Sequence, residues 1–256
     1  MSPAEPRRFT ILARLGISPT AARLVTAALD EAIEAAGARA RNGDGPGISA
    51  LDAGCGRVSH LKRYRSRIER LVGADIHEPP PGALPHLDSF ATVDLCIERD
   101  AFPPAAFDIV LSSFTVEHFL DPAAAFGNLR CWLRPGGRLV LTTVNRRHPF
   151  VAAYLGLPDR LRRRLQPLVK ATAADAHPLV GACNEPAGLA AALADAGFVD
   201  VRVATVGHLA RAWGRHLPTF ALGLAGDLLA QPFPSRRSTI VVSATAPATA
   251  PATAPP

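Results

Sequence analysis

The chain has 256 residues, 48% of them hydrophobic, which is enough for one α/β domain with a sizeable core. No apolar run reaches the roughly 18 residues that a membrane-spanning helix needs, because even the stretch 217–230 contains Pro218 and Asp227. Residues 1–14 lack the long apolar segment of a secretory signal. We therefore expect a cytoplasmic protein that is not an integral membrane protein.

The charge balance alone does not identify a binding partner. The 28 basic and 22 acidic residues give a net charge of +6, and all the basic residues except Lys62 and Lys170 are arginines. This balance fits a nucleic-acid footprint, but a general compositional preference for Arg, Ala and Pro, with the charges on solvated faces, explains it more simply.

The cysteines predict reduced thiols. They lie far apart, form no C-x-x-C pair and have no histidine cluster beside them: Cys55, Cys96, Cys131 and Cys183. We therefore expect neither a disulfide framework nor a bound metal.

The first predicted element is a leading helix. Ser18-Pro19 is a typical helix start, and apolar residues then recur at helical spacing until Gly37, where we expect the helix to end. Turn-forming residues at 42–47 follow. These boundaries predict an N-terminal helical extension at 1–46 and a main domain at 47–246.

From residue 48 onward, strand-like and helix-like segments alternate. Strands are expected at 48–52, 71–75, 90–94, 107–113, 138–144, 199–206 and 238–246, and helices at 57–70, 122–133 and 186–196. Such alternation is typical of a parallel sheet buried on both faces. We predict a Rossmann-like, doubly wound, mainly parallel sheet of seven strands.

Three segments depart from this alternation. Residues 146–184 form an expected helical insert or lid, whose Arg160–Arg164 cluster is either a solvated helix face or a site for phosphate, nucleic acid or an anionic membrane. Residues 217–229 are interpreted as a core helix, with a membrane-facing or dimer-forming helix as the alternatives. The Ala-, Pro- and Thr-rich tail at 247–256 is expected to be disordered.

A glycine turn after the first strand indicates a nucleoside site. Gly54 and Gly56 let a ligand approach bare backbone at the carboxyl end of that strand. Asp75 ends the next strand, 23 positions beyond Asp52, where an acid can accept hydrogen bonds from both hydroxyls of a ribose. A nicotinamide dinucleotide is an alternative ligand, although the third glycine of its fingerprint is absent.

Several motifs then occur in an order that resembles a known family. The segments LDAGCGR, VGADI, FDIVLSSFTVEHFLDP, LRPGGRLVLTTVN and LADAGF are similar to the successive motifs of class I S-adenosylmethionine-dependent methyltransferases, type-11 group. The resemblance covers Ile48 to Phe198 and, more weakly, the last strand. It implies an S-adenosylmethionine-dependent enzyme that transfers a methyl group to an O, N or C atom.

The resemblance also assigns cofactor-binding residues. It places Asp52, Gly54, Cys55 and Gly56 around the methionine end of the cofactor, with Asp52 near its amino group. Asp75 would bind the ribose and Ile76 would pack on the adenine. The remaining contacts implied are Asp94 to the adenine amino group, the Leu95 backbone to the adenine ring and the Ser112 backbone to the methionine end.

Some of these roles have structural alternatives. Asp52 and Asp94 are also typical caps of helices or turns, and Asp100 competes with Asp94 for the adenine. Val58 stands where the family has a third glycine, which makes the loop a variant one. Gly136 and Gly137 are interpreted as a turn.

Methyl transfer from a sulfonium needs mainly positioning, together with a base if the acceptor must lose a proton. His118, just beyond the fourth strand, is the first candidate for this base, although the family's Glu-His pair is often structural. His148 and His177 are further candidates. Asn145 ends the fifth strand, where it either contacts substrate or caps a turn.

We expect a small-molecule acceptor. The chain lacks the N-P-P-aromatic and Pro-Cys motifs of nucleic-acid methyltransferases, so nucleic acid is not the expected acceptor, although their absence leaves RNA open. Peripheral membrane contact is open, and the sequence indicates no oligomeric state. The alternatives are a non-catalytic protein that binds the cofactor, its product or a partner, and a nicotinamide-dependent oxidoreductase.

Overall fold

The computed structural model describes residues 21–42, 47–56, 59–158, 160–162, 164–165, 183–214 and 216–248. Expectations for the helix start at 18–20, for Val58, for His177 and for residues 249–256 lie outside these ranges.

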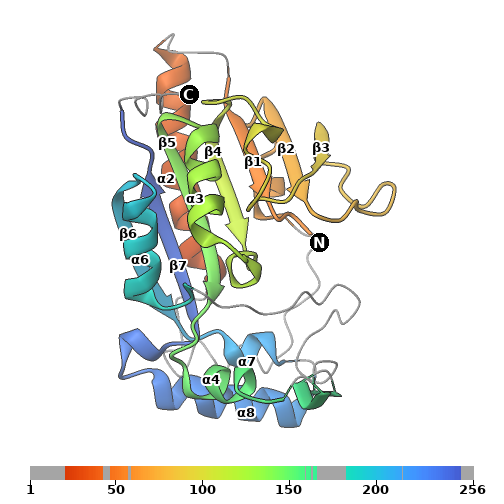
Figure 1. The fold of residues 1–256 in the computed structure, drawn as a ribbon, viewed down its shortest axis with the longest axis vertical. Coiled ribbons are helices and arrows are strands. Elements are labelled where there is room, and N and C mark those ends of the chain that lie inside the picture. The colour runs from red at the N-terminus through yellow and green to blue at the C-terminus, as the bar shows by residue number, and fades with distance from the viewer. Residues whose placement is uncertain are drawn as a thin grey trace.

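A single seven-stranded sheet forms the centre of the molecule (Figure 1). Its strands are β1 (Ser49–Ala53), β2 (Arg70–Asp75), β3 (Ser89–Thr92), β4 (Phe107–Ser113), β5 (Leu133–Val144), β6 (Val199–Val206) and β7 (Thr239–Thr245). Their order is β3-β2-β1-β4-β5-β7-β6, and only the pairings of β7 with β5 and β6 are antiparallel. The predicted doubly wound, mainly parallel sheet is confirmed.

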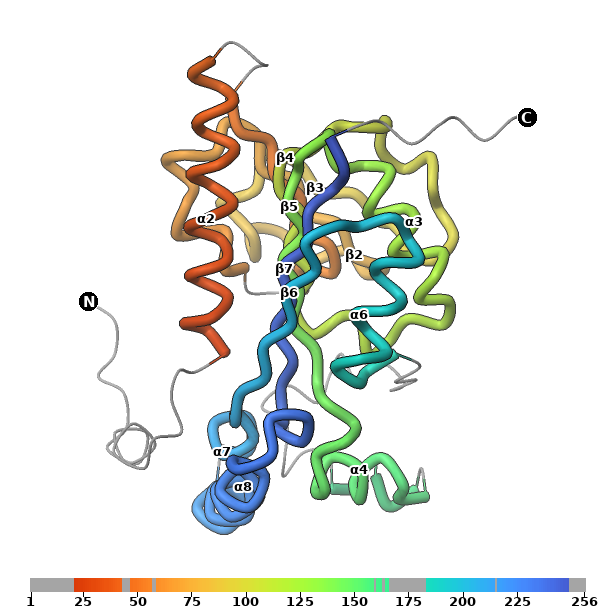
Figure 2. Tube along the Cα trace, turned by 90° about the vertical axis from the view of Figure 1, so that its left-hand side faces the viewer, coloured from red at the N-terminus to blue at the C-terminus, as the bar shows by residue number. Residues whose placement is uncertain are grey.

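Helices cover both faces of this sheet (Figure 2). Helix α2 (Ala21–Arg41) lies on one face, where its buried side chains, such as Leu29 and Ile33, pack on the strands. Helices α3 (Pro122–Trp132) and α6 (Pro186–Asp195) lie on the other face, over a core that includes Trp132 and Phe126. The central strands β1 and β4 are therefore shielded on both faces, which explains their largely apolar sequences.

Helix α2 does not end at Gly37, as the sequence predicted, but continues to Arg41. A glycine inside a helix costs only about 1 kcal/mol, and buried Ile33 and Ala36 hold this part of the helix on the sheet. The last turn also carries Arg39 and Arg41, and cations at a helix C-terminus interact favourably with its dipole.

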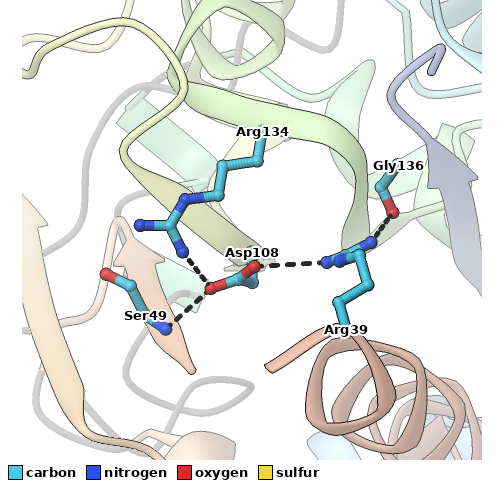
Figure 3. Close-up of polar contacts among 5 residues, drawn as sticks. All are labelled: Arg39, Ser49, Asp108, Arg134 and Gly136. Carbon is cyan, nitrogen blue, oxygen red and sulfur yellow. Dashed lines mark hydrogen bonds and ion pairs between the residues drawn. The ribbon is translucent and has the colours of Figure 1, made fainter. Parts of the chain in front are cut away.

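A buried carboxylate ties this helix end to the sheet (Figure 3). Asp108 of β4 is paired with both Arg39 and Arg134, and it accepts a hydrogen bond of 2.9 Å from the backbone N of Ser49. Arg39 also donates to the carbonyl oxygen of Gly136 at 2.6 Å. These contacts lie at the amino ends of β1 and β4, opposite the edge where the sequence predicts the ligand.

The helix predicted at 57–70 is wrong in its described part. The chain forms a 3₁₀ helix, η1 (His60–Tyr64), and then a turn in which the backbone N atoms of Arg67 and Ile68 donate to the Tyr64 carbonyl. Leu61, Tyr64 and Ile68 are buried nonetheless. Arg65 and Arg67 pair with Asp88 and Glu34 of neighbouring segments, and these tertiary contacts accompany the shorter element.

A group of helices lies beyond the carboxyl ends of β5 and β6 (Figures 1 and 2). It consists of α4 (Pro149–Leu155), α7 (Leu209–Ala212), α8 (Leu217–Ala230) and η4 (Pro234–Arg236), and we call it the cap. The other short helices are η2 (Arg99–Ala101) and η3 (Val116–His118). Within the described residues, no helix has the length and apolar character to cross a bilayer.

Buried Asp227 of α8 anchors the cap. One of its carboxyl oxygens accepts a hydrogen bond of 2.8 Å from the Ser238 hydroxyl, and the other accepts one of 2.8 Å from the backbone N of Ala210. Helix α8 is not the core helix that its sequence predicted, because Leu217 is 69% exposed and Leu229 66% exposed. Only its face toward α7 and α4 is buried.

Candidate cofactor and acceptor site

The turn after β1 exposes bare backbone at the carboxyl edge of the sheet. Gly54 and Gly56 adopt positive φ angles of 74° and 51°, which glycine tolerates without strain. The backbone N atoms of Gly54 and Cys55 donate to the Ala74 carbonyl at 2.7 and 3.1 Å, which holds the turn against β2. A Cβ on Gly54 would lie 2.2 Å from the Thr115 hydroxyl, whereas one on Gly56 would meet open space.

Asp52 is a buried acid with an unsatisfied oxygen. It is 1% exposed, and one carboxyl oxygen has no hydrogen-bond partner in the described part of the chain. Burial raises the pKa of Asp52 to about 7; a hydrogen bond from the Ser59 hydroxyl opposes this shift, and the charge of Asp75 adds to it. Such an acid is poised to ionise when a cation binds beside it.

Asp75 and Ile76 follow at the end of β2. One Asp75 oxygen accepts a hydrogen bond of 3.0 Å from the backbone N of Gly56, and the other accepts one of 3.2 Å from that of His77. Asp75 therefore faces the glycine turn. The Ile76 side chain is 45% exposed at the same edge, where a flat apolar ligand group can cover it.

Asp94 and Leu95 lie after β3, beside the end of β2. The backbone N of Val93 donates to the Asp75 carbonyl at 2.9 Å, which brings the two acidic positions to one edge. One Asp94 oxygen accepts a hydrogen bond of 2.8 Å from the backbone N of Cys96, so Asp94 caps this turn, and its contact with adenine stays a prediction. The Leu95 carbonyl accepts a hydrogen bond of 2.9 Å from the Asn128 amide.

Ser112 and Cys55 complete the set predicted around the methionine end. Leu111 pairs with Asp52 across the sheet, so Ser112 lies one residue nearer the edge; it is fully buried. Burial raises the pKa of the Cys55 thiol to about 12, so the thiol stays protonated at neutral pH.

The Glu-His pair lies on η3, directly after β4. Glu117 is 3% exposed and accepts a hydrogen bond of 2.7 Å from the Thr143 hydroxyl, which ties η3 to β5. The backbone N of His118 donates to the Thr115 carbonyl at 2.9 Å. Glu117 is therefore a structural residue, and the role of His118 as a base stays a prediction.

Two other candidates have structural partners. The Asn145 amide donates to the carbonyls of Ser235 and Arg237 at 3.0 and 2.7 Å, so it links the ends of β5 and η4. His148 is buried, and its Nδ1 accepts from the backbone N of Phe150 at 3.2 Å at the start of α4. The Asn145 side-chain oxygen also accepts a hydrogen bond of 3.0 Å from the backbone N of Arg147, so Asn145 caps the turn after β5 as predicted, and His148 serves as a helix cap.

Sequence reasoning missed an aromatic pair near this edge. Phe114 follows β4 with a positive φ of 55°, which is rare for an aromatic residue and costs roughly 1–3 kcal/mol. Its ring is 37% exposed and stacks on that of His208, with 6.1 Å between the ring centroids. Burial lowers the pKa of His208 to about 4, and its Nδ1 has no hydrogen-bond partner in the described ranges.

Neither residue carried a sequence signal. Phe114 and His208 are 94 positions apart in the chain, and only the antiparallel return of β7 between β5 and β6 brings the segment after β6 toward β4. In the described ranges, no group of three or more His, Cys, Asp or Glu side chains is arranged to hold a metal.

Comparison with known proteins identifies the family. A family profile described as a methyltransferase domain matches residues 22–203. The chain therefore belongs to the methyltransferase-domain family, which confirms the resemblance found in the sequence. The match begins one residue after the start of α2, so the helix predicted as an extension lies within the family profile.

Individual relatives agree with this family. Nocamycin O-methyltransferase from Saccharothrix syringae is 31% identical over 172 residues, which cover 61% of this chain and 61% of that protein. Ubiquinone biosynthesis O-methyltransferase from Pseudomonas paraeruginosa (strain DSM 24068 / PA7) is 32% identical over 106 residues, 39% of this chain and 46% of that protein. The chain thus matches about half to three fifths of the length of these relatives.

The fold is also that of a solved methyltransferase. Geranyl diphosphate C-methyltransferase from Streptomyces coelicolor A3(2), solved with Mg²⁺, geranyl-S-thiolodiphosphate and S-adenosyl-L-homocysteine, superposes with a TM-score of 0.50 at 17% identity. The superposition covers 79% of this chain and 70% of that one. At this identity the likeness establishes the fold alone.

Proposed function

We propose that the chain binds S-adenosylmethionine at the carboxyl edge of β1, β2 and β4 and transfers its methyl group to a small molecule. The observation that carries this proposal is the buried Asp52, with an unsatisfied oxygen, beside a glycine turn that leaves open space. A buried acid without a cation is costly, so its position calls for a ligand with a positive group. The cofactor's methionine amino group is such a group.

The other residues at this edge fit the rest of the cofactor. Asp75 faces the turn and has acceptor oxygens for two ribose hydroxyls. Ile76, which is 45% exposed, would cover one face of the adenine. Asp94 and Leu95 would meet the adenine edge, and the Ser112 backbone would meet the methionine end, with Cys55 packing beneath the turn.

The chain's own contribution to the chemistry is mainly positioning. The cofactor supplies a methyl group already activated by a positively charged sulfur. Asp52 and Asp75 would fix the methionine end and the ribose of the cofactor, which holds the methyl group in line with an acceptor atom. Both relatives described above are named O-methyltransferases, which favours an oxygen atom as the acceptor.

Three side chains would face the acceptor. His118 follows β4 and would take the proton that a hydroxyl loses. Phe114 presents an exposed aromatic face beside the same strand end. Since His208 is neutral at physiological pH, its Nδ1 can accept a hydrogen bond from a hydroxyl or amine of the acceptor. We further propose that the protein acts in the cytoplasm and needs no metal.

The test is transfer of labelled methyl groups. Metabolite extract is incubated with the protein and methyl-labelled S-adenosylmethionine, and the products are separated to find the compound that takes up label. We expect one labelled small molecule, absent with Asp75→Ala and retained with Asp195→Ala, a matched change at an exposed acid of α6. Cofactor binding without label in any extract would favour the non-catalytic alternative, and label in protein or RNA would refute the small-molecule acceptor.

A further inference from the structure

The outer face of α8 is an uninterrupted apolar surface. Its exposed residues are Leu217, Pro218, Ala221, Leu222, Ala225, Leu228 and Leu229. At 3.6 residues per turn they cover an arc of about 140°, while Phe220, Gly223, Gly226, Asp227 and Ala230 fill the opposite, buried face. The exposed Phe233, 55% accessible, extends this surface past the end of the helix. The one charged residue of α8, Asp227, lies on the buried face.

The two sequence segments that contain the cap helices are also the basic part of the chain. Segments 146–165 and 207–238 contain ten of the 28 basic residues but only two of the 22 acidic ones, a net charge of +8. The rest of the chain is therefore slightly acidic, since the whole carries +6. Of the two acids, Asp227 lies on the buried face of α8.

Basic and apolar groups adjoin each other on the cap. The Arg236 guanidinium lies 5.9 Å from the centre of the Phe233 ring, at the C-terminal end of the α8 surface. Arg147, Arg160 and Arg164 are exposed in the segments around α4, which packs against α8 (Figure 1). Binding of a protein to the interface of an anionic membrane grows with the apolar area it buries there and with the attraction of its cations to the lipids, and the cap offers both.

We propose that the cap docks on an anionic lipid bilayer, with the leucines of α8 inserted among the acyl chains and the arginines on the lipid phosphates. The charge of the segments around α8 favours an anionic lipid bilayer over a second copy of the chain as the partner of this surface. A symmetric dimer through α8 would bring the basic segments of two copies together, whereas an anionic surface complements them. A nucleic acid would satisfy the arginines but leave the leucine face in water.

Docking in this way orients the rest of the molecule. The cap follows the carboxyl ends of β5 and β6, and the parallel strands β1, β2 and β4 end at that same edge. The edge with Asp52, Asp75 and Phe114 would thus face the membrane side. The docking surface itself does not depend on the proposed function.

The test measures partition of the full-length protein onto lipid vesicles. Vesicles of phosphatidylcholine alone are compared with vesicles containing phosphatidylglycerol, by flotation, at low and high salt. We expect binding to the anionic vesicles only, weakened at least tenfold by high salt because exposed charges are screened. Equal binding to neutral vesicles, or no binding to either, would overturn the proposal.

A charge-matched pair of variants locates the surface. Leu229→Glu places a carboxylate on the α8 face, and Val199→Glu places one at the start of β6, on an apolar residue that is 44% exposed outside the cap. We expect partition to fall at least tenfold for Leu229→Glu and less than twofold for Val199→Glu. Thermal melts of both variants check folding.

Sedimentation velocity and calorimetry separate this proposal from its rivals. A dimer of the wild type that Leu229→Glu dissociates, without vesicle binding, would show that α8 is a homodimer interface and refute docking. S-adenosylmethionine binding should be the same in Leu229→Glu and the wild type. Failure of docking and failure of cofactor binding are therefore separate results.

Discussion

Asp52→Asn should change stability and cofactor affinity in opposite directions. The substitution keeps the shape of a buried side chain and removes its ability to ionise. Burial raises the pKa of Asp52 to about 7, whereas an unfolded chain has an aspartate pKa near 3.9. Between these values the folded protein holds a proton that the unfolded chain has released, so the free energy of unfolding falls as pH rises through this window.

The size of the effect follows from the shift. About three pKa units at about 1.4 kcal/mol each give a loss on the order of 4 kcal/mol between pH 4 and pH 7, and no further loss above pH 7. Asp52 is 1% exposed, so solvent screening does not reduce this figure. The Asp52→Asn variant lacks this loss, so its stability relative to the wild type should rise by this amount as pH rises.

Urea unfolding at several pH values between 4 and 8 measures the difference in free energy of unfolding between Asp52→Asn and the wild type. The titration of other groups affects both proteins equally and cancels in this difference. We expect the difference to grow through this window and to level off near pH 7. Cofactor affinity should fall at least tenfold in the variant at pH 8, because the carboxylate beside the methionine amino group is gone. Parallel stability curves for the two proteins would refute the raised pKa and the reasoning built on it.

Three further substitutions separate ligand contacts from structural ones. Gly54→Ala should lower the free energy of unfolding by about 2 kcal/mol or more and abolish cofactor binding, because φ is 74° and the new Cβ would lie 2.2 Å from the Thr115 hydroxyl. Urea unfolding measures the first effect and calorimetry the second. An unchanged stability would contradict the turn geometry. Ile76→Ala should weaken cofactor affinity, measured by calorimetry, by about tenfold. Stability should not change, since the side chain is 45% exposed. Unchanged affinity would show that the adenine lies elsewhere. Asp108→Asn should lower the free energy of unfolding, measured in urea, by about 2 kcal/mol because it breaks two partly buried ion pairs. Cofactor affinity should stay the same. A loss of affinity would mean that the amino and carboxyl edges of the sheet are coupled.

The central strands could be predicted closely because they are buried on both faces. The segment from Phe107 to Ser113 is centred on the apolar residues Ile109–Leu111, and β4 has the predicted bounds. The helix signals of α3 were equally direct, since Asp121 accepts a hydrogen bond of 3.0 Å from the backbone N of Ala124 and Pro122 is the first helical residue. Local chemistry fixes these elements.

The misses arose where tertiary contacts override the local pattern. Apolar spacing could not distinguish a long helix after the glycine turn from η1 and a turn, because Leu61, Tyr64 and Ile68 are buried in either case. Helix α8 has one charged residue, Asp227, and no polar stripe, which is typical of a core helix, so its exposed face became visible only in the fold. The pairing of Phe114 with His208 likewise depends on long-range topology.

Calorimetric titration of S-adenosylmethionine into the wild type and Asp75→Ala tests the central claim most directly. Asp75 faces the glycine turn, accepting a hydrogen bond of 3.0 Å from the backbone N of Gly56, and the proposed site assigns it to the ribose. We predict one binding site in the wild type and an affinity at least tenfold weaker in the variant. No binding to the wild type, or equal affinity in both proteins, would contradict the assignment of this edge as the cofactor site.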